Sequence, residues 1–136
     1  MSGIGAQGDG EVALIVGGGP GVSASCARHF SEAGMRVAIA ARTPDKPVLI
    51  ALEKEFGVAR FACDASDPES VVRLFADVES QLGAPRLVVH NIDGRVKEIF
   101  RKELIEADSK LVLQTIHNSA YSAFLVGQQA ARTMLS

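Results

Sequence analysis

The chain has 136 residues, of which 47% are hydrophobic, and its 14 basic and 16 acidic side chains give a formal net charge of −2. This length and composition suit one globular domain with a buried core, and they argue against disordered, collagen-like and coiled-coil proteins. The small net charge offers no electrostatic surface for nucleic acid or an anionic membrane.

The cysteines and the apolar runs narrow the class further. Cys26 and Cys63 are far apart and have no histidines at ligand spacing, so neither a disulfide scaffold nor a metal site is predicted. No apolar stretch approaches the ~18 residues of a membrane span. The first ten residues lack the positive start and apolar run of a secretory signal. We therefore expect a soluble, cytoplasmic protein.

Four short apolar runs recur at nearly even intervals and predict four strands, over residues 12–16, 36–41, 58–63 and 86–90. The first, second and fourth runs lack strict alternation of apolar and polar residues. That pattern is typical of strands covered on both faces in a parallel sheet.

The segments between these runs have the spacing and the end residues of helices. They are predicted at 22–32, at 47–56 with Gly57 just after, and from an N-cap sequence at Ser66 to Gly83. Strands that alternate with helices predict right-handed βαβ units. The expected fold is α/β, a Rossmann-like doubly wound parallel sheet with strand order 3-2-1-4, truncated before the later strands.

The C-terminal part of the chain has a different character. Residues 91–101 are predicted as a loop, and a long helix is predicted from near Asp108. The apolar surface of this helix is wider than one stripe, so we expect burial on two sides, by the sheet and by a partner. The fourth strand would also present an open edge. We therefore expect a homo-oligomer that forms through this helix, or else a chain that is part of a longer protein.

Two glycine-rich stretches compete for a phosphate-binding role. Residues 3–8 match G-x-G-x-x-G, but no strand precedes them and no helix follows. We therefore predict a flexible N-terminal tail over residues 1–10 and a dinucleotide-binding domain over residues 11–136.

The second stretch, residues 17–21, lies between a predicted strand and a predicted helix. Gly17, Gly19 and Gly21 let the backbone turn and approach a diphosphate, and Pro20 and Val22 complete the loop and the helix start. The helix N-terminus offers unpaired N–H groups and a positive dipole end. The alternative is a merely tight turn, but four glycines in five positions exceed what a turn needs.

Gly17 and Gly21 fall on the first two glycines of T-G-x-x-x-G-x-G, and here the chain resembles the short-chain dehydrogenase/reductase family. Val16 replaces the threonine of that motif, and Ser23 replaces its last glycine. The resemblance spans essentially the whole chain, yet only the N-terminal, cofactor-binding part of such an enzyme. It implies an NAD(P)-dependent oxidoreductase that transfers hydride between its cofactor and an alcohol or carbonyl of a small-molecule substrate.

Arg42 and Thr43 follow the second predicted strand directly, about 20 residues past the glycine loop. An acidic residue there would bind a free ribose 2′-hydroxyl, whereas an arginine suits a 2′-phosphate. The resemblance to NADP-preferring family members therefore implies NADP(H) rather than NAD(H). The alternative is a solvated surface arginine.

Two further places look like the residues that, by the resemblance, line the floor of the cofactor site. Asp64 and Ala65 fall where the family has an acidic residue beside the adenine ring, although Asp64 could instead cap a turn. His90, Asn91, Ile92 and Asp93 fall on the family's N-N-A-G, in which only Asn91 is retained. A histidine at a strand end is more often a packing residue than a catalytic base, and Asp93 adds a carboxylate near the cofactor.

The catalytic residues of the family are not found in this chain. Tyr121 is the single tyrosine, and Leu125 stands where Tyr-x-x-x-Lys has lysine, so Tyr121 is interpreted as a core or interface residue. The family's helix asparagine corresponds to Ser119, which is the candidate for a modified role. Asn118 is one position off, or ~100° around a helix, and is expected to point elsewhere.

Two other functions remain open from the sequence. A non-catalytic nucleotide-binding or regulatory Rossmann domain would explain Asp93, Ser119 and the short chain. The second of these functions is that of a mononucleotide-binding or flavin-binding protein whose glycine loop is coincidental.

Overall fold

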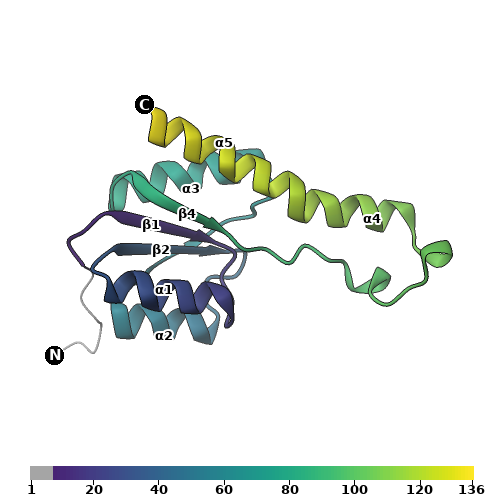
Figure 1. The fold of residues 1–136 in the computed structure, drawn as a ribbon, viewed down its shortest axis with the longest axis horizontal. Coiled ribbons are helices and arrows are strands. Elements are labelled where there is room, and N and C mark those ends of the chain that lie inside the picture. The colour runs from purple at the N-terminus through teal and green to yellow at the C-terminus, as the bar shows by residue number, and fades with distance from the viewer. Residues whose placement is uncertain (1–7) are drawn as a thin grey trace.

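The computed structural model describes residues 8–136, so the first glycine-rich stretch lies outside the described residues except for Gly8. Within this range, four parallel strands form one sheet in the order β3-β2-β1-β4 (Figure 1). The strands are β1 (Val12–Val16), β2 (Arg36–Ala41), β3 (Ala59–Ala62) and β4 (Pro85–His90). The predicted Rossmann-like α/β fold and its strand order are confirmed.

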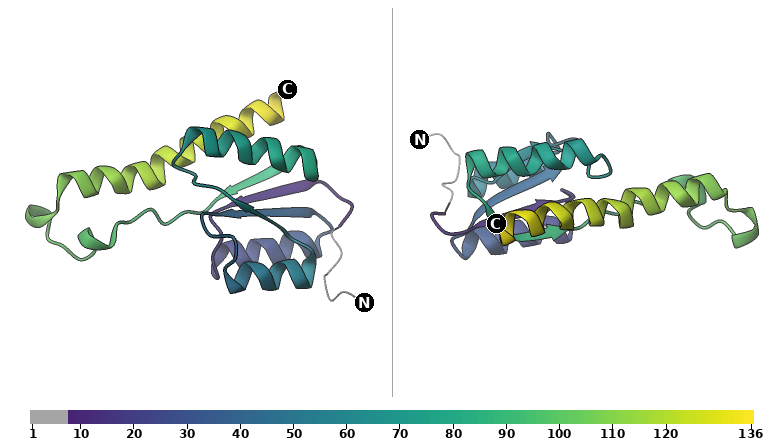
Figure 2. Two further views of the ribbon diagram at one scale, coloured as in Figure 1. Left: turned by 180° about the vertical axis from the view of Figure 1, so that it is seen from behind. Right: turned by 90° about the horizontal axis from the view of Figure 1, so that it is seen from above.

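Three helices connect the strands and cover the sheet. α1 (Val22–Glu32) and α2 (Pro47–Phe56) have the predicted bounds, and α3 (Pro68–Gln81) begins after its N-cap, Asp67. α2 ends at Gly57, whose φ of 71° is a left-handed conformation that glycine adopts without strain. Figure 2 shows α1 and α2 on one side of the sheet and α3 on the other.

The core has two layers because β1 and β2 are buried on both faces, as their unbroken apolar runs predict. On one face, Leu14 and Ala38 pack with α3 and with the C-terminal helix. On the other face, Ile15 and Ile39 pack with α1 and α2. Because both faces of the sheet are covered there, a binding site can form only at the ends of these strands.

β4 differs from this prediction, because it is only partly covered. Leu87 is 36% exposed, and Val88 and Val89 are each partly buried against one of the two core layers. The physical reason is position: β4 is an edge of the described sheet, so it lacks a neighbouring strand and a helix above that neighbour.

The C-terminal helix consists of α4 (Ser109–Ile116), a π-helical turn (His117–Tyr121) and α5 (Ser122–Leu135). It begins where predicted, with the Asp108 carboxylate accepting the Lys110 N–H at 2.8 Å. The sheet covers one side of α5, as expected, and burial of the other side by a partner stays a prediction. Only α5 packs on the sheet, through Leu125 and Val126, whereas α4 extends past it (Figure 1).

The segment between β4 and α4 is the predicted loop with two short 3₁₀ turns in it, at Lys97–Ile99 and Leu104–Glu106. It is tied to α4 by the Val96 N–H, which donates to the Thr115 hydroxyl at 3.2 Å. Across residues 8–136, no helix combines the length and the hydropathy needed to cross a membrane.

Candidate functional site: a cleft at the carboxyl ends of the strands

The main cavity lies where the carboxyl ends of the parallel strands meet, which is the usual ligand position in an open α/β sheet. Its volume is about 690 Å³, within the range of small-molecule and cofactor sites. The residues that follow each strand line it, together with residues of the C-terminal helix. Of the predicted site residues, those that line it are Gly17, Gly19, Gly21, Val22, Arg42, Asp64, Ala65, Asn91 and Ile92.

Two glycines of the loop are required by the fold itself. Gly17 has a φ of 109°, and a Cβ at that position would overlap the Asn91 carbonyl. A Cβ at Gly18 would lie 2.9 Å from a methyl carbon of Leu49. The start of the loop is therefore glycine because the backbone passes close to its neighbours.

The other two glycines have no such requirement. A Cβ at Gly19 or at Gly21 would meet no described atom within 4 Å, and both residues line the cavity. No described side chain caps α1 at Gly21, which leaves its first-turn N–H groups open to a ligand. At Gly19 and Gly21 the backbone therefore lies open to the cavity.

Ser23, which replaces the motif's last glycine, joins the loop to β4. Its buried hydroxyl donates to the Gly17 carbonyl at 2.5 Å and accepts from the Asn91 side-chain amide at 3.0 Å. The Asn91 backbone N–H donates to the Val16 carbonyl at 2.9 Å. The sequence indicated only that serine is small enough for this position; the bridging role depends on the tertiary fold.

Two cations lie on the β2 side of the cavity. Arg42 is exposed, lines the cavity and forms no hydrogen bond or ion pair with any residue of 8–136. Lys46 also lines it, and its Nζ donates to the Gly18 carbonyl at 3.0 Å. Sequence reasoning missed Lys46, although a second cation four residues after Arg42 and next to Pro47 was visible. Thr43 is exposed and does not line the cavity.

Asp64 both caps a turn and lines the cavity. Its Oδ1 accepts from the Ser66 hydroxyl at 2.7 Å and from the Ser66 N–H at 3.0 Å. These bonds, above all that of the hydroxyl, lower the Asp64 pKa, and the charges of Arg42 and His117 lower it further. The neighbouring Cys63 is a buried thiol whose pKa is raised by burial.

The carboxylate of Asp93 is neutralised by a residue that the sequence reasoning did not consider. Arg95 donates to both Asp93 oxygens, from Nε at 2.8 Å and from Nη2 at 2.7 Å. This pairing lowers the pKa of Asp93 to about 2. Both side chains line the cavity, so the extra carboxylate enters the site as one half of an ion pair.

The structure places Asn118, and not Ser119, in the cavity. The prediction that Asn118 points elsewhere is wrong because it assumed a regular α-helix. The π turn at His117–Tyr121 changes the angular position of the residues within it. Ser119 turns back, and its hydroxyl donates to the Thr115 carbonyl at 2.6 Å. His117 and Gln114 also line the cavity, and the sequence reasoning missed both.

Three further predicted residues lie outside the cavity lining. Pro20 is exposed. His90 has its Nε2 2.8 Å from the Ser122 hydroxyl, and burial lowers its pKa. Tyr121 stacks on His117 with ring centroids 4.8 Å apart, and Leu125, where the family pair would need lysine, is buried in the core.

Comparison with known proteins agrees with this geometry. A family model described as enoyl-(acyl carrier protein) reductase matches residues 18–136. The chain is 31% identical over 121 residues to the 3-oxoacyl-[acyl-carrier-protein] reductase MabA of Mycobacterium avium, covering 89% of this chain and 43% of that protein. It is 36% identical over 96 residues to an uncharacterized oxidoreductase of Caenorhabditis elegans, covering 63% of this chain and 29% of that protein.

Solved structures show the same relationship. A short-chain type dehydrogenase/reductase from Mycobacterium marinum superimposes with a TM-score of 0.83 at 25% identity, over 94% of this chain and 51% of that one. An enoyl-(acyl-carrier-protein) reductase from Anaplasma phagocytophilum in complex with NAD shares the fold, with a TM-score of 0.81 at 23% identity, over 91% of this chain and 49% of that one. The chain spans less than half the length of the curated relatives named above. The match over residues 18–136 nevertheless covers most of its own length, and the chain belongs to the short-chain dehydrogenase/reductase family.

Proposed function

We propose that this chain is the cofactor-binding part of an NADP(H)-dependent oxidoreductase that acts on an alcohol or carbonyl substrate. The observation that carries the proposal is the cleft beside Gly19 and Gly21, which side chains leave open, with the unpaired Arg42 at its rim. If side chains filled that space, the diphosphate would have no place to bind. If Arg42 pointed away from it, the 2′-phosphate would have no cation there.

The residues that line the cleft fit a dinucleotide from end to end. The N–H groups at the start of α1 would hold the diphosphate, and Arg42 with Lys46 would hold a ribose 2′-phosphate. Asp64 would lie at the adenine ring, and Asn91 and Ile92 would lie towards the nicotinamide. When bound, the cofactor would supply or accept the hydride.

No residue of this chain is proposed as the proton donor. Tyr121 lies outside the cavity lining and lacks a lysine four residues later. A positioned general acid typically contributes 10²–10⁴ in rate. We therefore propose that this chain binds cofactor well and turns over substrate poorly. Thioesters of acyl carrier protein are the first substrates to test with the whole protein, because the matched family and the M. avium relative are named for them.

The direct test is a fluorescence titration of the purified chain with NADPH, NADH and FMN. The proposal expects saturable binding of NADPH that is tighter than that of NADH, and no saturable binding of FMN. Tight binding of FMN alone would favour a flavin protein, and absence of binding by all three would remove the nucleotide-binding function.

We also propose that two copies of the chain associate through the C-terminal helix. One stripe of this helix is exposed and carries no charge, with apolar or small residues recurring every three or four positions, as in paired helices. The residues are Leu113, Ile116, Ala120, Phe124, Gly127 and Ala131. The occupant is a second copy because the same stripe on each chain lets one helix pair with its own equivalent across a two-fold axis.

A further inference from the structure

The π turn that brings Asn118 into the cavity is held by serine hydroxyls. Ser122, the first residue of α5, has its Oγ 2.7 Å from the Asn118 carbonyl and 2.8 Å from the Ser119 carbonyl, both of which lie in the turn. Ser122 is completely buried, so water does not compete for these bonds. A π turn lacks the regular hydrogen-bond pattern of an α-helix, and the Ser122 hydrogen bonds stabilise this irregular backbone at Asn118.

The same hydroxyl lies 2.8 Å from Nε2 of His90, at the end of β4. A serine hydroxyl has one proton, and a carbonyl oxygen can only accept. Two carbonyl oxygens at 2.7–2.8 Å require that the Ser122 proton points towards them. With the Ser122 proton directed to a carbonyl, the Nε2–H tautomer of His90 would donate to the Ser122 hydroxyl, and the donor and acceptor roles in this contact depend on that tautomer.

Gly94 supports the other side of the turn. It is buried, and a Cβ there would lie 2.7 Å from the Ser119 nitrogen and 2.8 Å from the Asn118 carbonyl carbon. The Gly94 carbonyl also accepts from the Asn118 side-chain amide at 3.3 Å. Thus the end of β4 and the loop after it contact this part of the helix at two points: His90 contacts Ser122 of α5, and Gly94 contacts Asn118 of the π turn.

We infer that His90 is a positioning residue, which acts through Ser122 to hold the π turn in the geometry that presents Asn118 to the nicotinamide end of the cleft. The ligand in this inference rests on the proposed function. The contact between His90 and Ser122 does not depend on that proposal. It gives His90 a role although its side chain lies outside the cavity lining.

The test uses the whole chain with four single variants, His90→Ala, His90→Gln, Ser122→Ala and Asn118→Ala, and with His29→Ala as a control. The ligands are NADPH and adenosine 2′,5′-bisphosphate, which has the adenosine half without nicotinamide. His90→Ala and Ser122→Ala are expected to weaken NADPH binding about five- to tenfold. Both are expected to bind adenosine 2′,5′-bisphosphate within twofold of the wild type. His90→Gln, whose amide can donate to Ser122, restores NADPH binding, and His29→Ala, a change at an exposed histidine of α1, leaves both ligands unaffected.

A double variant decides whether His90 acts through Asn118. His90→Ala combined with Asn118→Ala is expected to bind NADPH no more weakly than Asn118→Ala alone, because both changes remove the same contact. Additive losses, equal losses for both ligands, or no loss in His90→Ala would each overturn the inference.

Amide hydrogen exchange of the ligand-free chain separates this inference from the proposed function. His90→Ala is expected to raise exchange at residues 119–123 relative to α3, and His90→Gln is expected to leave it near the wild-type level. If the wild type binds neither ligand, the proposed function fails, and the exchange data still decide the contact. Unchanged exchange in His90→Ala would refute it.

Discussion

The side-chain amide of Asn91 donates to the hydroxyl of Ser23 at 3.0 Å, which connects the end of β4 to the first turn of α1. Ser23 in turn donates to the Gly17 carbonyl, so one buried hydroxyl holds the glycine loop and the strand end together. The two residues are 68 positions apart in the sequence. Their contact therefore sets the spacing between the diphosphate end and the nicotinamide end of the proposed cofactor site.

Replacement of Ser23 by alanine removes both hydrogen bonds. We expect Ser23→Ala to lower the free energy of unfolding by ~1–3 kcal/mol, because the Gly17 carbonyl loses its partner. NADPH binding is expected to weaken several-fold because Asn91 is no longer held. Urea denaturation and a fluorescence titration measure the two effects. Ser25→Ala, an exposed change on the same helix, is the control, and equal behaviour of the two variants would contradict this account.

The two kinds of glycine in the loop should respond differently to alanine. Gly17→Ala places a Cβ on the Asn91 carbonyl and keeps a φ of 109°. We therefore expect the free energy of unfolding to fall by ~3 kcal/mol or more. Gly19→Ala has free space for its methyl group, so stability should stay within about 1 kcal/mol of the wild type. That methyl group nevertheless occupies the cleft, and NADPH affinity is expected to fall about tenfold. If Gly19→Ala binds NADPH as the wild type does, the diphosphate does not lie there.

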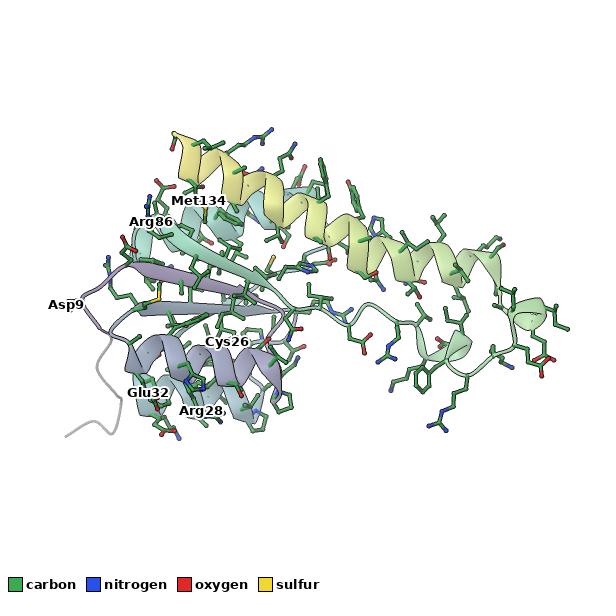
Figure 3. The ribbon with its side chains drawn as sticks, viewed as in Figure 1. Asp9, Cys26, Arg28, Glu32, Arg86 and Met134 are labelled. Atoms are coloured by element: carbon green, nitrogen blue, oxygen red, sulfur yellow. The ribbon has the colours of Figure 1, made fainter. Side chains whose placement is uncertain are left out.

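Arg42 should decide between the two nicotinamide cofactors. A charge-assisted contact to the 2′-phosphate contributes ~1.5–3 kcal/mol, so Arg42→Asp should weaken NADPH binding roughly ten- to hundredfold and NADH binding much less. Arg28→Asp makes the same charge change at an exposed position of α1 (Figure 3) and serves as the control. Titrations with both cofactors at fixed ionic strength measure the ratio. Equal losses for NADPH and NADH would leave Arg42 without a role in cofactor choice.

The partly buried His90 should make stability depend on pH. Burial lowers its pKa below the ordinary value of 6.5, so near that pH the unfolded chain binds the proton more readily than the folded chain. Its contribution to the free energy of unfolding is complete above pH 6.5 and decreases as the pH falls below it. Asp64 and Asp93 have lowered pKa values and act in a separate window below 3.8. Urea denaturation at pH 7.5 and 5.5 should show a smaller difference for His90→Gln than for the wild type, and an equal difference would contradict the assignment.

The exposed stripe of the C-terminal helix should mediate self-association. Phe124 is 59% exposed at its centre, and a glutamate there would place two like charges against each other in a symmetric pair. We expect Phe124→Glu to shift the chain from dimer to monomer in sedimentation velocity runs. Val72→Glu, a change at an exposed valine on α3, should leave the dimer intact. A wild-type chain that stays monomeric at high concentration would rule out the pairing.

Much of the fold follows from local patterns in the sequence. The apolar runs of β1 and β2 are buried on both faces because each is continuous, and α2 has its predicted bounds because Pro47 begins it and Gly57 ends it. The position of the glycine loop between β1 and α1 was predictable for the same reason, since it depends only on neighbours in the chain. Arg42 follows from its place at the end of a strand in a parallel sheet.

Other features were decided only by tertiary structure. The contact of Lys46 with Gly18, 28 positions away, depends on how the loop after β2 folds back, which no periodicity encodes. Helical spacing assigned the wrong direction to Asn118 because a π turn, fixed by contacts with His90 and Gly94, interrupts the regular helix. The sequence by itself thus determined the elements, their order and the place of the glycine loop. Contacts between distant segments decided which side chains face the cleft, because side-chain direction depends on backbone geometry that only those contacts impose.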